Sequence, residues 1–495
     1  MLADVLTEHL GRHRDRTAVT DRHTSLSYAD LLRAAGQAAD EIRRRTAGRD
    51  RPRVGITARN SASYLVAYVG AVLAGAVPLL IDAATGDTEL ARLDEDCTPD
   101  LLVHDRAPGP ADLPLPGAPG LAVTVRPERA RAYPMRDDTA VCRFTSGTTG
   151  KPNCIEFSGR AVHAAAANWA AGTGLSGEDR IICFAGLSNG LAFNTSLLAA
   201  FLTGARLHLP HGLPTAGRVS RELRGAGATR LVAFPALYDA IARRDGPDDA
   251  FAGIRQAISS GAPLSAATAA RFHEVTGLVI ADYYGIAETG PLTFAAEPGP
   301  GAGLGSPLPG VVLRAGDGGA PAGVRVRSES MASRYLNAPG LLESRIGADG
   351  LYDTGDQGVL RDGRLFLTAR STRMVNVAGR KIDPVEVAGA LREIPGVDDA
   401  VVLEAVDRHG QTALGAVVAS AVLDTAAVRA AARDRLTAHK VPSLLRVVPR
   451  IPAGAIGKPS MAELRSLLGE KTEPAAVPGT PPGPFRSAES QERHA

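Results

Sequence analysis

The 495-residue sequence has no marked excess of charge and no long apolar run at its start. Its formal net charge is +2 and no basic run stands out, so a nucleic-acid partner is not expected. Residues 1–19 mix acidic and basic side chains early, which is typical of neither a signal peptide nor a membrane anchor. The sequence therefore favours a cytoplasmic protein without a membrane partner.

Cysteine is scarce too, and the cysteines lack the paired spacing of a metal site or a disulfide framework. The four residues are Cys97, Cys142, Cys154 and Cys183. In the absence of an export signal, they are expected to be reduced and buried, acting as small apolar residues.

Lysine is rare beside abundant arginine, with five residues in the whole chain. A GC-rich codon bias accounts for most of this imbalance. Under that bias, a lysine that remains is expected where a compact ammonium cannot be replaced by a planar guanidinium. This marks Lys151 and Lys458 as candidates for function.

The chain is too long for one core, so two or more domains are expected. Its first part alternates β-rich runs with helical patterns, among them Ser61–Gly75, which reads as an amphipathic helix. Such alternation predicts an α/β fold with largely parallel strands, in which ligands collect outside the carboxyl ends of the strands.

Shifts in amino-acid composition and in helix and strand patterns divide the chain further. We expect a large N-terminal α/β region over residues 1–369, with a β-rich subdomain at about 305–369. A small α+β domain is expected over residues 374–470. The Pro-rich, polar residues 471–495 are expected to be a disordered tail.

The segment TSGTTGKPN, Thr145–Asn153, follows the apolar run TAVCRF and is dense in hydrogen-bond donors. The residues that supply hydroxyls, tight turns and a positive charge are Thr145, Ser146, Gly147, Thr148, Thr149, Gly150 and Lys151. A Walker loop is excluded, because its two glycines lie farther apart and a hydroxyl residue stands where Pro152 follows the lysine. The segment predicts a phosphate loop of another kind, with a plain surface turn as the alternative.

Further motifs follow this loop, and their order resembles the adenylate-forming superfamily of acyl-CoA synthetases, peptide-synthetase adenylation domains and luciferases. The resemblance covers about residues 5–470. The matching segments are AISSGAPL (257–264), YYGIAETG (283–290), LYDTGDQG (351–358), ARSTRMVNVAGRKIDPVEV (369–387) and the Gly-Lys at residues 457–458.

The resemblance implies that a carboxylate attacks the α-phosphate of ATP, which gives an acyl-adenylate and pyrophosphate, and that a nucleophile then displaces AMP. The 145–151 loop would hold the β- and γ-phosphates, and Glu288 would bind Mg²⁺. The implied nucleotide contacts are Gly261, Ala262, Tyr284 and Gly285 near adenine, and Asp356 and Arg370 at the ribose.

In the resemblance, Lys458 enters the site on a mobile C-terminal domain and bridges the substrate carboxylate and the α-phosphate. Residues 370–373 match the hinge, with Thr372 at the usual acidic or basic position. Gly379 matches a glycine beside the pantetheine channel. Ala287 replaces the expected threonine, as in some aryl-acid members, so it does not indicate a dead enzyme.

The acyl pocket is expected to draw on residues 184–207, which contain no acidic residue. A buried ammonium without a carboxylate partner is costly, so an α-amino acid substrate is disfavoured. Asn189, or Asn194 as second choice, could meet a ring hydroxyl as in aryl-acid members; capping a turn is equally open. The predicted pocket residues are Phe184, Asn189, Gly190, Phe234 and Gly285.

We therefore expect activation of a carboxylic acid, preferably aromatic, and transfer to a thiol of CoA or of a carrier protein's phosphopantetheine. Transfer to an amine and ATP-driven nitrite activation stay open, because both would use the same ATP site. A non-catalytic adenylate-binding protein is disfavoured by the presence of Lys458, Glu288 and Asp356. The sequence leaves the identity of the acid and the oligomeric state open.

Overall fold

The chain divides after Thr372 into two units, named unit 1 (Met1–Thr372) and unit 2 (Arg373–Ala495). This computed structural model describes residues 2–85, 87–131, 133–145, 153–212, 214–244, 246–261, 264–299, 302–317, 320–370, 375–377, 380–382, 384–407, 412–436, 440–452 and 459–469. The predicted hinge at 370–373 spans the division, but its role stays a prediction because Thr372 lies outside the described residues.

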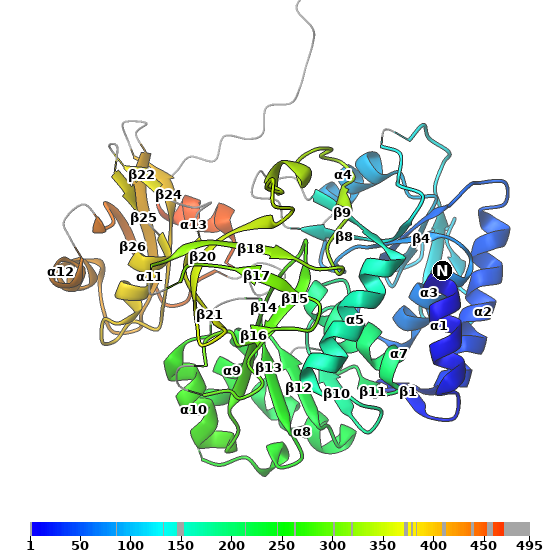
Figure 1. Ribbon diagram of the computed structural model, residues 1–495, viewed down its shortest axis with the longest axis horizontal. Coiled ribbons are helices and arrows are strands. Elements are labelled where there is room, and N and C mark those ends of the chain that lie inside the picture. Colours follow the sequence, from blue (N-terminus) through cyan, green and yellow to red (C-terminus); the bar gives the residue numbers. More distant parts are fainter. Residues whose placement is uncertain are drawn as a thin grey trace, which may run out of the picture. The chain divides into compact units, whose positions relative to one another are not determined.

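The described part of unit 1 contains a nine-stranded sheet whose central strands are parallel (Figure 1). In spatial order the strands are β16 (Ser306–Pro307), β15 (Gly290–Phe294), β14 (Ile280–Ile286), β13 (Gln256–Ser259), β12 (Arg230–Ala233), β10 (Arg180–Cys183), β11 (Arg206–His208), β1 (Thr17–Thr20) and β2 (Ser25–Ser27). The run from β14 to β1 is parallel, and β15, β16 and β2 pair antiparallel at the two ends.

A second, eight-stranded sheet carries the strands on either side of the predicted phosphate loop. Its order is β19 (Arg334–Tyr335), β9 (Asn153–Ser158), β8 (Thr139–Thr145), β4 (Val77–Leu80), β3 (Arg53–Thr57), β5 (Leu101–His104), β7 (Ala122–Val125) and β6 (Leu113–Pro114). The β8–β4–β3–β5 run is parallel, whereas β8 and β9 form an antiparallel pair up to Thr145 and Asn153. Together the two sheets confirm the predicted α/β class.

A four-stranded antiparallel sheet occupies the region predicted to be β-rich. It contains β17 (Val312–Arg314), β18 (Ala322–Arg327), β20 (Tyr352–Arg361) and β21 (Arg364–Arg370). Two other short strands of the same region, β16 and β19, instead extend the two large sheets.

The described part of unit 1 also contains α-helices and a π-helix, some of which begin at side-chain caps. They are α1 (Leu2–Arg12), α2 (Tyr28–Arg45), α3 (Ala62–Leu73), α4 (Asp87–Cys97), α5 (Gly159–Thr173), α6 (Gly190–Ala192), the π-helix η1 (Phe193–Leu198), α7 (Ala199–Thr203), α8 (Ala216–Ala226), α9 (Pro235–Ala242) and α10 (Ala266–Thr276). At α2, the side chains of Ser27 and Asp30 each accept a hydrogen bond from the other's backbone N–H, a reciprocal capping box.

Helix α3 corrects the sequence prediction. The segment is helical as predicted, but it is not amphipathic: every residue from Ala62 to Val72 is buried. The reason is tertiary, because α1 and α2 cover α3 on one side and β3 and β4 contact it on another. A surface helix would have shown a polar stripe.

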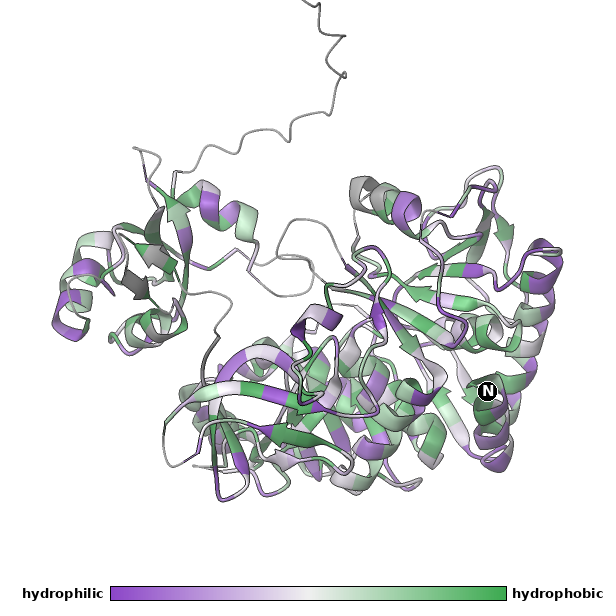
Figure 2. Cartoon of the chain, turned by 45° about the horizontal axis from the view of Figure 1, so that its top comes forward, coloured by the Kyte–Doolittle hydropathy of each residue, from purple (hydrophilic) through white to green (hydrophobic). Residues whose placement is uncertain are grey.

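One tryptophan joins α5 to the nine-stranded sheet. Trp169 is buried, and its ring centroid lies 5.0 Å from that of Tyr283 on β14 and 5.4 Å from that of Phe294 on β15. Helix α5 also contacts β8 and β9, so it bridges the two large sheets. Figure 2 shows hydrophobic strands inside unit 1 and hydrophilic patches on its peripheral helices and loops.

Unit 2 has its own small core. Its described elements are β22 (Val375–Val377), β23 (Arg380–Ile382), α11 (Pro384–Arg392), β24 (Asp399–Val406), β25 (Thr412–Ala419), α12 (Thr425–Arg435), β26 (Leu444–Val448) and α13 (Met461–Leu467). Strands β24, β25 and β26 form one sheet, and α11 packs against β24.

The state of the cysteines and the length of the apolar helices can be given for the described residues. The four cysteines are free and buried, as predicted. No helix within the described ranges combines the length and apolar character that a membrane crossing requires.

A buried ion pair lies at the amino ends of β10 and β12, and it leads to a stability prediction. Asp179 accepts hydrogen bonds from the Thr229 hydroxyl (2.8 Å) and pairs with Arg230 (3.2 Å). Burial raises the pKa of Asp179, but the Ser176 amide, Arg230 and Thr229 outweigh it and hold that pKa below its ordinary value. Asp179→Asn should lower the free energy of unfolding by about 3–5 kcal/mol, because it leaves Arg230 buried without its charge partner.

Urea unfolding at pH 7 measures this loss, and the exposed Asp249→Asn serves as control. Asp249 pairs with Arg224 on the surface, so its change should cost less than about 1 kcal/mol. Because the pKa of Asp179 is lowered on folding, its contribution should be present at neutral pH and vanish as the pH falls below about 4. Equal losses in the two variants would contradict the prediction.

Candidate functional site

The β14–β15 hairpin carries Glu288 at its turn. The turn is tight: a Cβ atom on Gly285 would lie 2.4 Å from the Gly290 carbonyl oxygen, and Gly290 has a φ of +70°. Only glycine fits both requirements without displacing the hairpin. Ala287 is exposed at the turn and Glu288 is half-buried. The hairpin therefore presents the Glu288 carboxylate at the end of strand β14.

Two contacts hold Glu288 in place. The Tyr335 hydroxyl on β19 donates a hydrogen bond of 2.5 Å to Oε1 of Glu288. The Ala332 amide donates to the Glu288 carbonyl oxygen at 2.7 Å. Burial, and then the nearby Glu288 charge, raise the pKa of Tyr335, so it stays a neutral donor. One carboxylate oxygen of Glu288 is thus engaged by Tyr335.

A hydrogen bond joins two residues that the sequence assigned to the nucleotide. The Tyr284 hydroxyl on β14 donates to Oδ2 of Asp356 on β20 at 2.6 Å. Both side chains are buried, and the Asp356 amide donates to the Thr354 hydroxyl oxygen at 3.1 Å. Asp356 is also the cross-strand partner of Arg370 on β21. The predicted adenine and ribose residues therefore lie beside one another.

The carboxyl ends of β12, β13 and β14 bring further predicted residues together. Gly261 follows β13 with a φ of +84°, and a Cβ atom there would lie 2.9 Å from Cε1 of Phe234, which follows β12. Adjacent parallel strands end at the same edge, as the α/β pattern predicts. Gly261 and Phe234 are in contact, and Tyr284 emerges from the neighbouring strand.

The sequence analysis missed Asp282 on β14. Asp282 is the register partner of Ser259 on β13, so the two side chains lie on the same face. Burial raises the pKa of Asp282 to about 7, against which the Tyr283 amide donates one hydrogen bond of 3.2 Å. The Ser259 hydroxyl is buried and has no hydrogen-bond partner among the described residues. An acidic residue in the apolar run VIADYYG was the available signal.

The predicted acyl segment begins after β10. Asn189 caps α6, and its side-chain oxygen Oδ1 accepts a hydrogen bond from the Leu191 N–H at 2.9 Å. This contact is the turn-capping role that the sequence left open for Asn189. Phe184 donates its amide to the Val232 carbonyl at 3.0 Å, which places it at the end of the sheet beside β12. A Cβ atom on Gly190 would lie 2.4 Å from Nη1 of Arg143.

Several predicted residues lie outside the part of the chain that the structure describes. They are Ser146, Gly147, Thr148, Thr149, Gly150, Lys151, Ala262, Thr372, Gly379 and Lys458. Thr145 ends β8 and Arg370 ends β21. The roles given to all these residues stay predictions.

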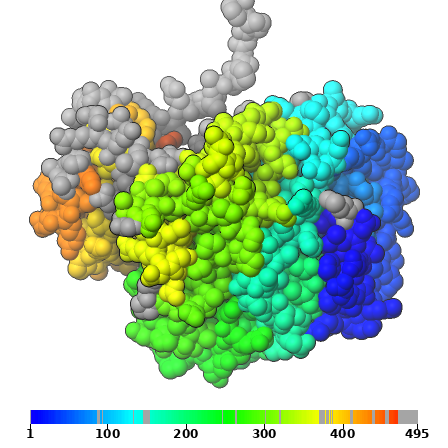
Figure 3. All heavy atoms as spheres, viewed as in Figure 1, coloured from blue at the N-terminus to red at the C-terminus, as the bar shows by residue number. Residues whose placement is uncertain are grey.

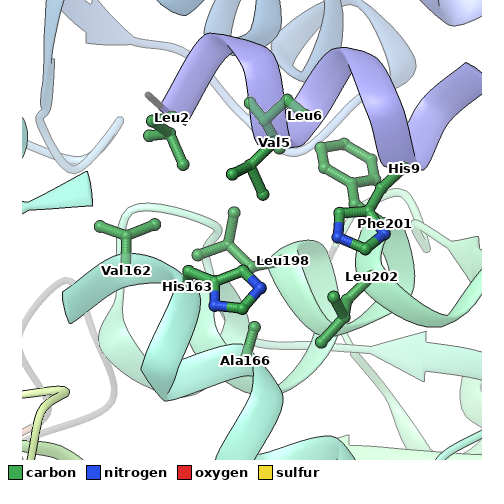
Figure 4. A pocket seen from close by; sticks show the side chains of 10 residues that line it. All are labelled: Leu2, Val5, Leu6, His9, Val162, His163, Ala166, Leu198, Phe201 and Leu202. Atoms are coloured by element: carbon green, nitrogen blue, oxygen red, sulfur yellow. The ribbon is translucent and has the colours of Figure 1, made fainter. Parts of the chain in front are cut away.

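A cavity elsewhere in unit 1 contains none of the predicted site residues. Figure 4 shows it between α1, α5 and α7, with the His9 and His163 rings among aliphatic side chains. The two ring centroids lie 6.2 Å apart. Figure 3 shows α1 at the surface beside the segment that contains α5 and α7. The apolar lining of this cavity fits the packing of α1 against its neighbours better than the binding of a nucleotide.

The chain is similar to proteins of known activity. Residues 6–336 match the family model described as AMP-binding enzyme. A 3-hydroxybenzoate–CoA ligase from Aromatoleum sp. (strain CIB) is 26% identical over 493 residues, covering 92% of this chain and 94% of that protein.

Two solved structures share the fold. The ATP-bound MatB from Rhodopseudomonas palustris has a TM-score of 0.78 at 22% identity, covering 94% of this chain and 99% of that chain. The anthranilate CoA ligase AuaEII, in complex with anthranoyl-AMP, has a TM-score of 0.77 at 21% identity, covering 94% and 96% respectively. Because the family match spans more than half of the sequence, the protein belongs to the AMP-binding enzyme family.

Proposed function

We propose that this enzyme activates a carboxylic acid with ATP and passes the acyl group to a thiol, preferably that of CoA. The observation that carries the proposal is the Tyr284–Asp356 hydrogen bond, which lies next to the hairpin that presents Glu288. The similarity to a 3-hydroxybenzoate–CoA ligase supports an aromatic acid and CoA as the two further substrates.

In the proposed first step, a carboxylate oxygen of the acid attacks the α-phosphorus of ATP, and the bond from that phosphorus to the pyrophosphate oxygen breaks. The chain contributes positioning and charge neutralisation rather than covalent chemistry. Tyr284 would lie against adenine, Asp356 would accept hydrogen bonds from the ribose hydroxyls, and residues 145–151 would bind the departing pyrophosphate.

Glu288 fits a role in holding Mg²⁺. Its carboxylate is half-buried and oriented by Tyr335, and hard cations prefer carboxylate oxygens. Within the described ranges no three His, Cys, Asp or Glu residues are grouped to hold a metal ion. Glu288 would therefore share the ion with phosphate oxygens and water, and the ion would neutralise phosphate charge.

In the proposed second step, a thiol sulfur attacks the acyl carbonyl carbon, the bond to the AMP oxygen breaks, and AMP leaves. A carrier-protein thiol and an amine are the alternative acceptors. Product identification by mass spectrometry with CoA or an amine distinguishes them.

The first test of the proposal concerns Lys458. Pyrophosphate exchange into ATP should depend on added acid in the wild-type enzyme, measured over a panel of aryl, aliphatic and amino acids. Lys458→Ala should lower this exchange by at least about 100-fold, because the lysine would stabilise charge in the transition state. ATP binding, measured by calorimetry, should persist.

Lys471→Ala is the matched control, since Lys471 belongs to the Pro-rich tail. Exchange retained in Lys458→Ala would refute the role of this lysine. Absence of exchange with every acid, while wild-type enzyme still binds ATP, would refute the proposed function.

The second test concerns the nucleotide contacts. Tyr284→Phe removes the hydroxyl that donates to Asp356, and Asp356→Asn removes the carboxylate charge. Hydrogen bonds to charged groups contribute about 1.5–3 kcal/mol, so Asp356→Asn should weaken ATP binding by about 10- to 150-fold. Tyr284→Phe should have a smaller effect in the same direction.

Calorimetric titration with ATP measures both effects. Tyr64→Phe is a matched control, because the Tyr64 hydroxyl is buried in α3 and has no hydrogen-bond partner among the described residues. ATP affinity unchanged in Asp356→Asn would contradict the assignment of Asp356 to the ribose.

The third test uses pH. We propose that Asp282 accepts a hydrogen bond from the adenine amino group, because it lies beside β13 one residue before the Tyr283–Tyr284 pair. With its pKa raised to about 7 by burial, Asp282 is protonated below that pH and ionised above it. The ionised carboxylate is the stronger acceptor, so ATP affinity should rise several-fold between pH 6 and pH 8.

Asp282→Asn should abolish most of this pH dependence, because an amide does not titrate in the range. The measurement is the dissociation constant of ATP at constant ionic strength. The pH dependence that remains in Asp282→Asn reports the ionisation of ATP itself, and the Tyr64→Phe control should keep the wild-type dependence. An equal pH dependence in wild type and Asp282→Asn would exclude Asp282 as its source.

A further inference from the structure

Arg143 on β8 is a buried arginine whose donors are largely unused. Its side chain is 4% exposed, and its single hydrogen bond among the described residues is a long one, 3.3 Å from Nη2 to the Ala287 carbonyl oxygen. Its Nε atom is buried without a hydrogen-bond partner in the same residues. Burial lowers the pKa of Arg143 to about 10, so it is still positively charged at neutral pH.

The other deeply buried arginines of the described chain show what is normal for this fold. Arg53 donates to the carbonyl oxygens of Cys97 and Tyr133, each at 2.6 Å. Arg230 pairs with Asp179 and donates to Thr173. Nε of Arg53 also lacks a hydrogen-bond partner among the described residues, but the bonds to carbonyl oxygens satisfy its terminal nitrogens. Buried charges are costly unless they are compensated, and Arg143 has the fewest hydrogen bonds of these three arginines.

Aromatic rings cover the faces of the Arg143 guanidinium, and a glycine lies beside one of its terminal nitrogens. The guanidinium carbon lies 4.3 Å from the Phe157 ring centroid and 5.6 Å from that of Phe193. These rings cover it with apolar carbon and favourable cation–π contacts. Nη1 reaches toward Gly190, where a Cβ atom would lie only 2.4 Å away, so the missing side chain of Gly190 gives the guanidinium its room.

A second unpaired polar group stands on the same aromatic cluster. The Tyr68 hydroxyl on α3 is buried and has no hydrogen-bond partner among the described residues. Its ring meets Phe193 edge-on, with the centroids 5.4 Å apart. The Arg143 guanidinium carbon lies 5.6 Å from the centroid of the same ring, so the two groups share one aromatic neighbour. Burial raises the pKa of Tyr68, and the Arg143 charge opposes that rise. A cation with one long hydrogen bond and a hydroxyl without a partner among the described residues, both in an apolar setting, complement an anionic oxygen group.

Position in the fold links this pair to the reacting centre. Arg143 is two residues before Thr145, where the predicted phosphate loop begins, and it donates to the residue before Glu288. The reacting carboxylate must approach the α-phosphate near those elements. The rest of the acid then has to lie close by, and Nη1 of Arg143 lies beside Gly190, which belongs to the predicted acyl segment.

We propose that Arg143, assisted by the Tyr68 hydroxyl, binds a second carboxylate on the acid, so that the enzyme prefers dicarboxylic acids over the corresponding monoacids. This inference rests on the proposed function and specifies its substrate class. Arg143 is a specificity-determining residue that binds the group which does not react.

The test compares acids that share a skeleton. One set is benzoate, 3-hydroxybenzoate and isophthalate, and the other is butanoate, 4-hydroxybutanoate and succinate. For the better-fitting skeleton, the wild-type kcat/KM in pyrophosphate exchange should be higher for the diacid than for the monoacid by on the order of 100-fold. This ratio is expected for hydrogen bonds to a charged group. Equal use of the hydroxy acid and the diacid would overturn the proposal.

Variants separate a specificity role from a structural one. Arg143→Met should lower kcat/KM for the diacid by on the order of 100-fold, mainly through KM, and change the monoacid less than about threefold. Arg143→Lys should recover part of the loss as a point charge. The exposed Arg160→Gln, which removes an ion pair with Glu329, is the control and should change neither.

A binding measurement makes the result independent of turnover. The diacid is titrated calorimetrically into each protein in the presence of AMP. It should bind the wild-type protein and fail to bind Arg143→Met at the same concentrations. Both proteins should bind ATP equally. The melting temperature of Arg143→Met should equal or exceed that of wild type, because the change removes a buried charge that has no partner.

Each contrary outcome has a definite meaning. An equal loss of activity for monoacid and diacid in Arg143→Met would show that Arg143 serves the reacting carboxylate or the phosphates, and would overturn the proposal. A lower melting temperature together with lost ATP binding would show a structural role and also overturn it. Failure of wild type to activate any acid despite bound ATP would refute the proposed function, and the inference with it.

Discussion

The hydrogen bond between Tyr284 and Asp356 connects the nine-stranded sheet to the four-stranded sheet at the candidate site. Tyr284 is fixed by its place on β14, and Asp356 by its place on β20. Both side chains are buried, so this hydrogen bond is shielded from water. The same short stretch of β14 then turns into the hairpin that presents Glu288. The β14–β15 hairpin therefore carries both Tyr284, a proposed nucleotide contact, and Glu288, the proposed metal contact.

The site combines rigidly packed side chains with buried polar groups that lack hydrogen-bond partners among the described residues. Trp169 fixes the β14–β15 hairpin from α5, and Tyr335 fixes the Glu288 carboxylate from β19. Around this frame stand buried groups whose hydrogen bonds are incomplete in the described residues, namely Ser259, Tyr68 and Nε of Arg143. Such groups lower stability unless a ligand completes them, which is a common cost of a binding site.

Much of the architecture could be predicted from sequence because local patterns carry it. The alternation of β-rich runs and helical segments predicted the α/β class, which the two large sheets confirm. The motifs around Tyr284 and Asp356 suggested nucleotide contacts through their resemblance alone, and that assignment stays a prediction. The burial of α3 could not be predicted, since it depends on α1 and α2 packing over a helix from elsewhere in the chain.

The missed residues were single charges inside apolar strands. Arg143 lies in TAVCRF and Asp282 in VIADYYG, and both runs were read for their strand character. Their significance comes from neighbours distant in sequence: Gly190 and Ala287 for Arg143, and Ser259 for Asp282. A charged residue in a buried strand is a signal that sequence offers, but its partner, or the lack of one, is known only from the fold.

The central claim is that a carboxylate oxygen attacks the α-phosphorus of ATP. It can be tested with an acid substrate labelled with ¹⁸O in both oxygens of the reacting carboxylate, followed by mass spectrometry of the AMP formed in a complete turnover. The mechanism predicts that AMP carries one ¹⁸O atom, because the attacking oxygen stays on phosphorus when the acyl group leaves. AMP free of ¹⁸O, formed together with the acyl product, would contradict the mechanism.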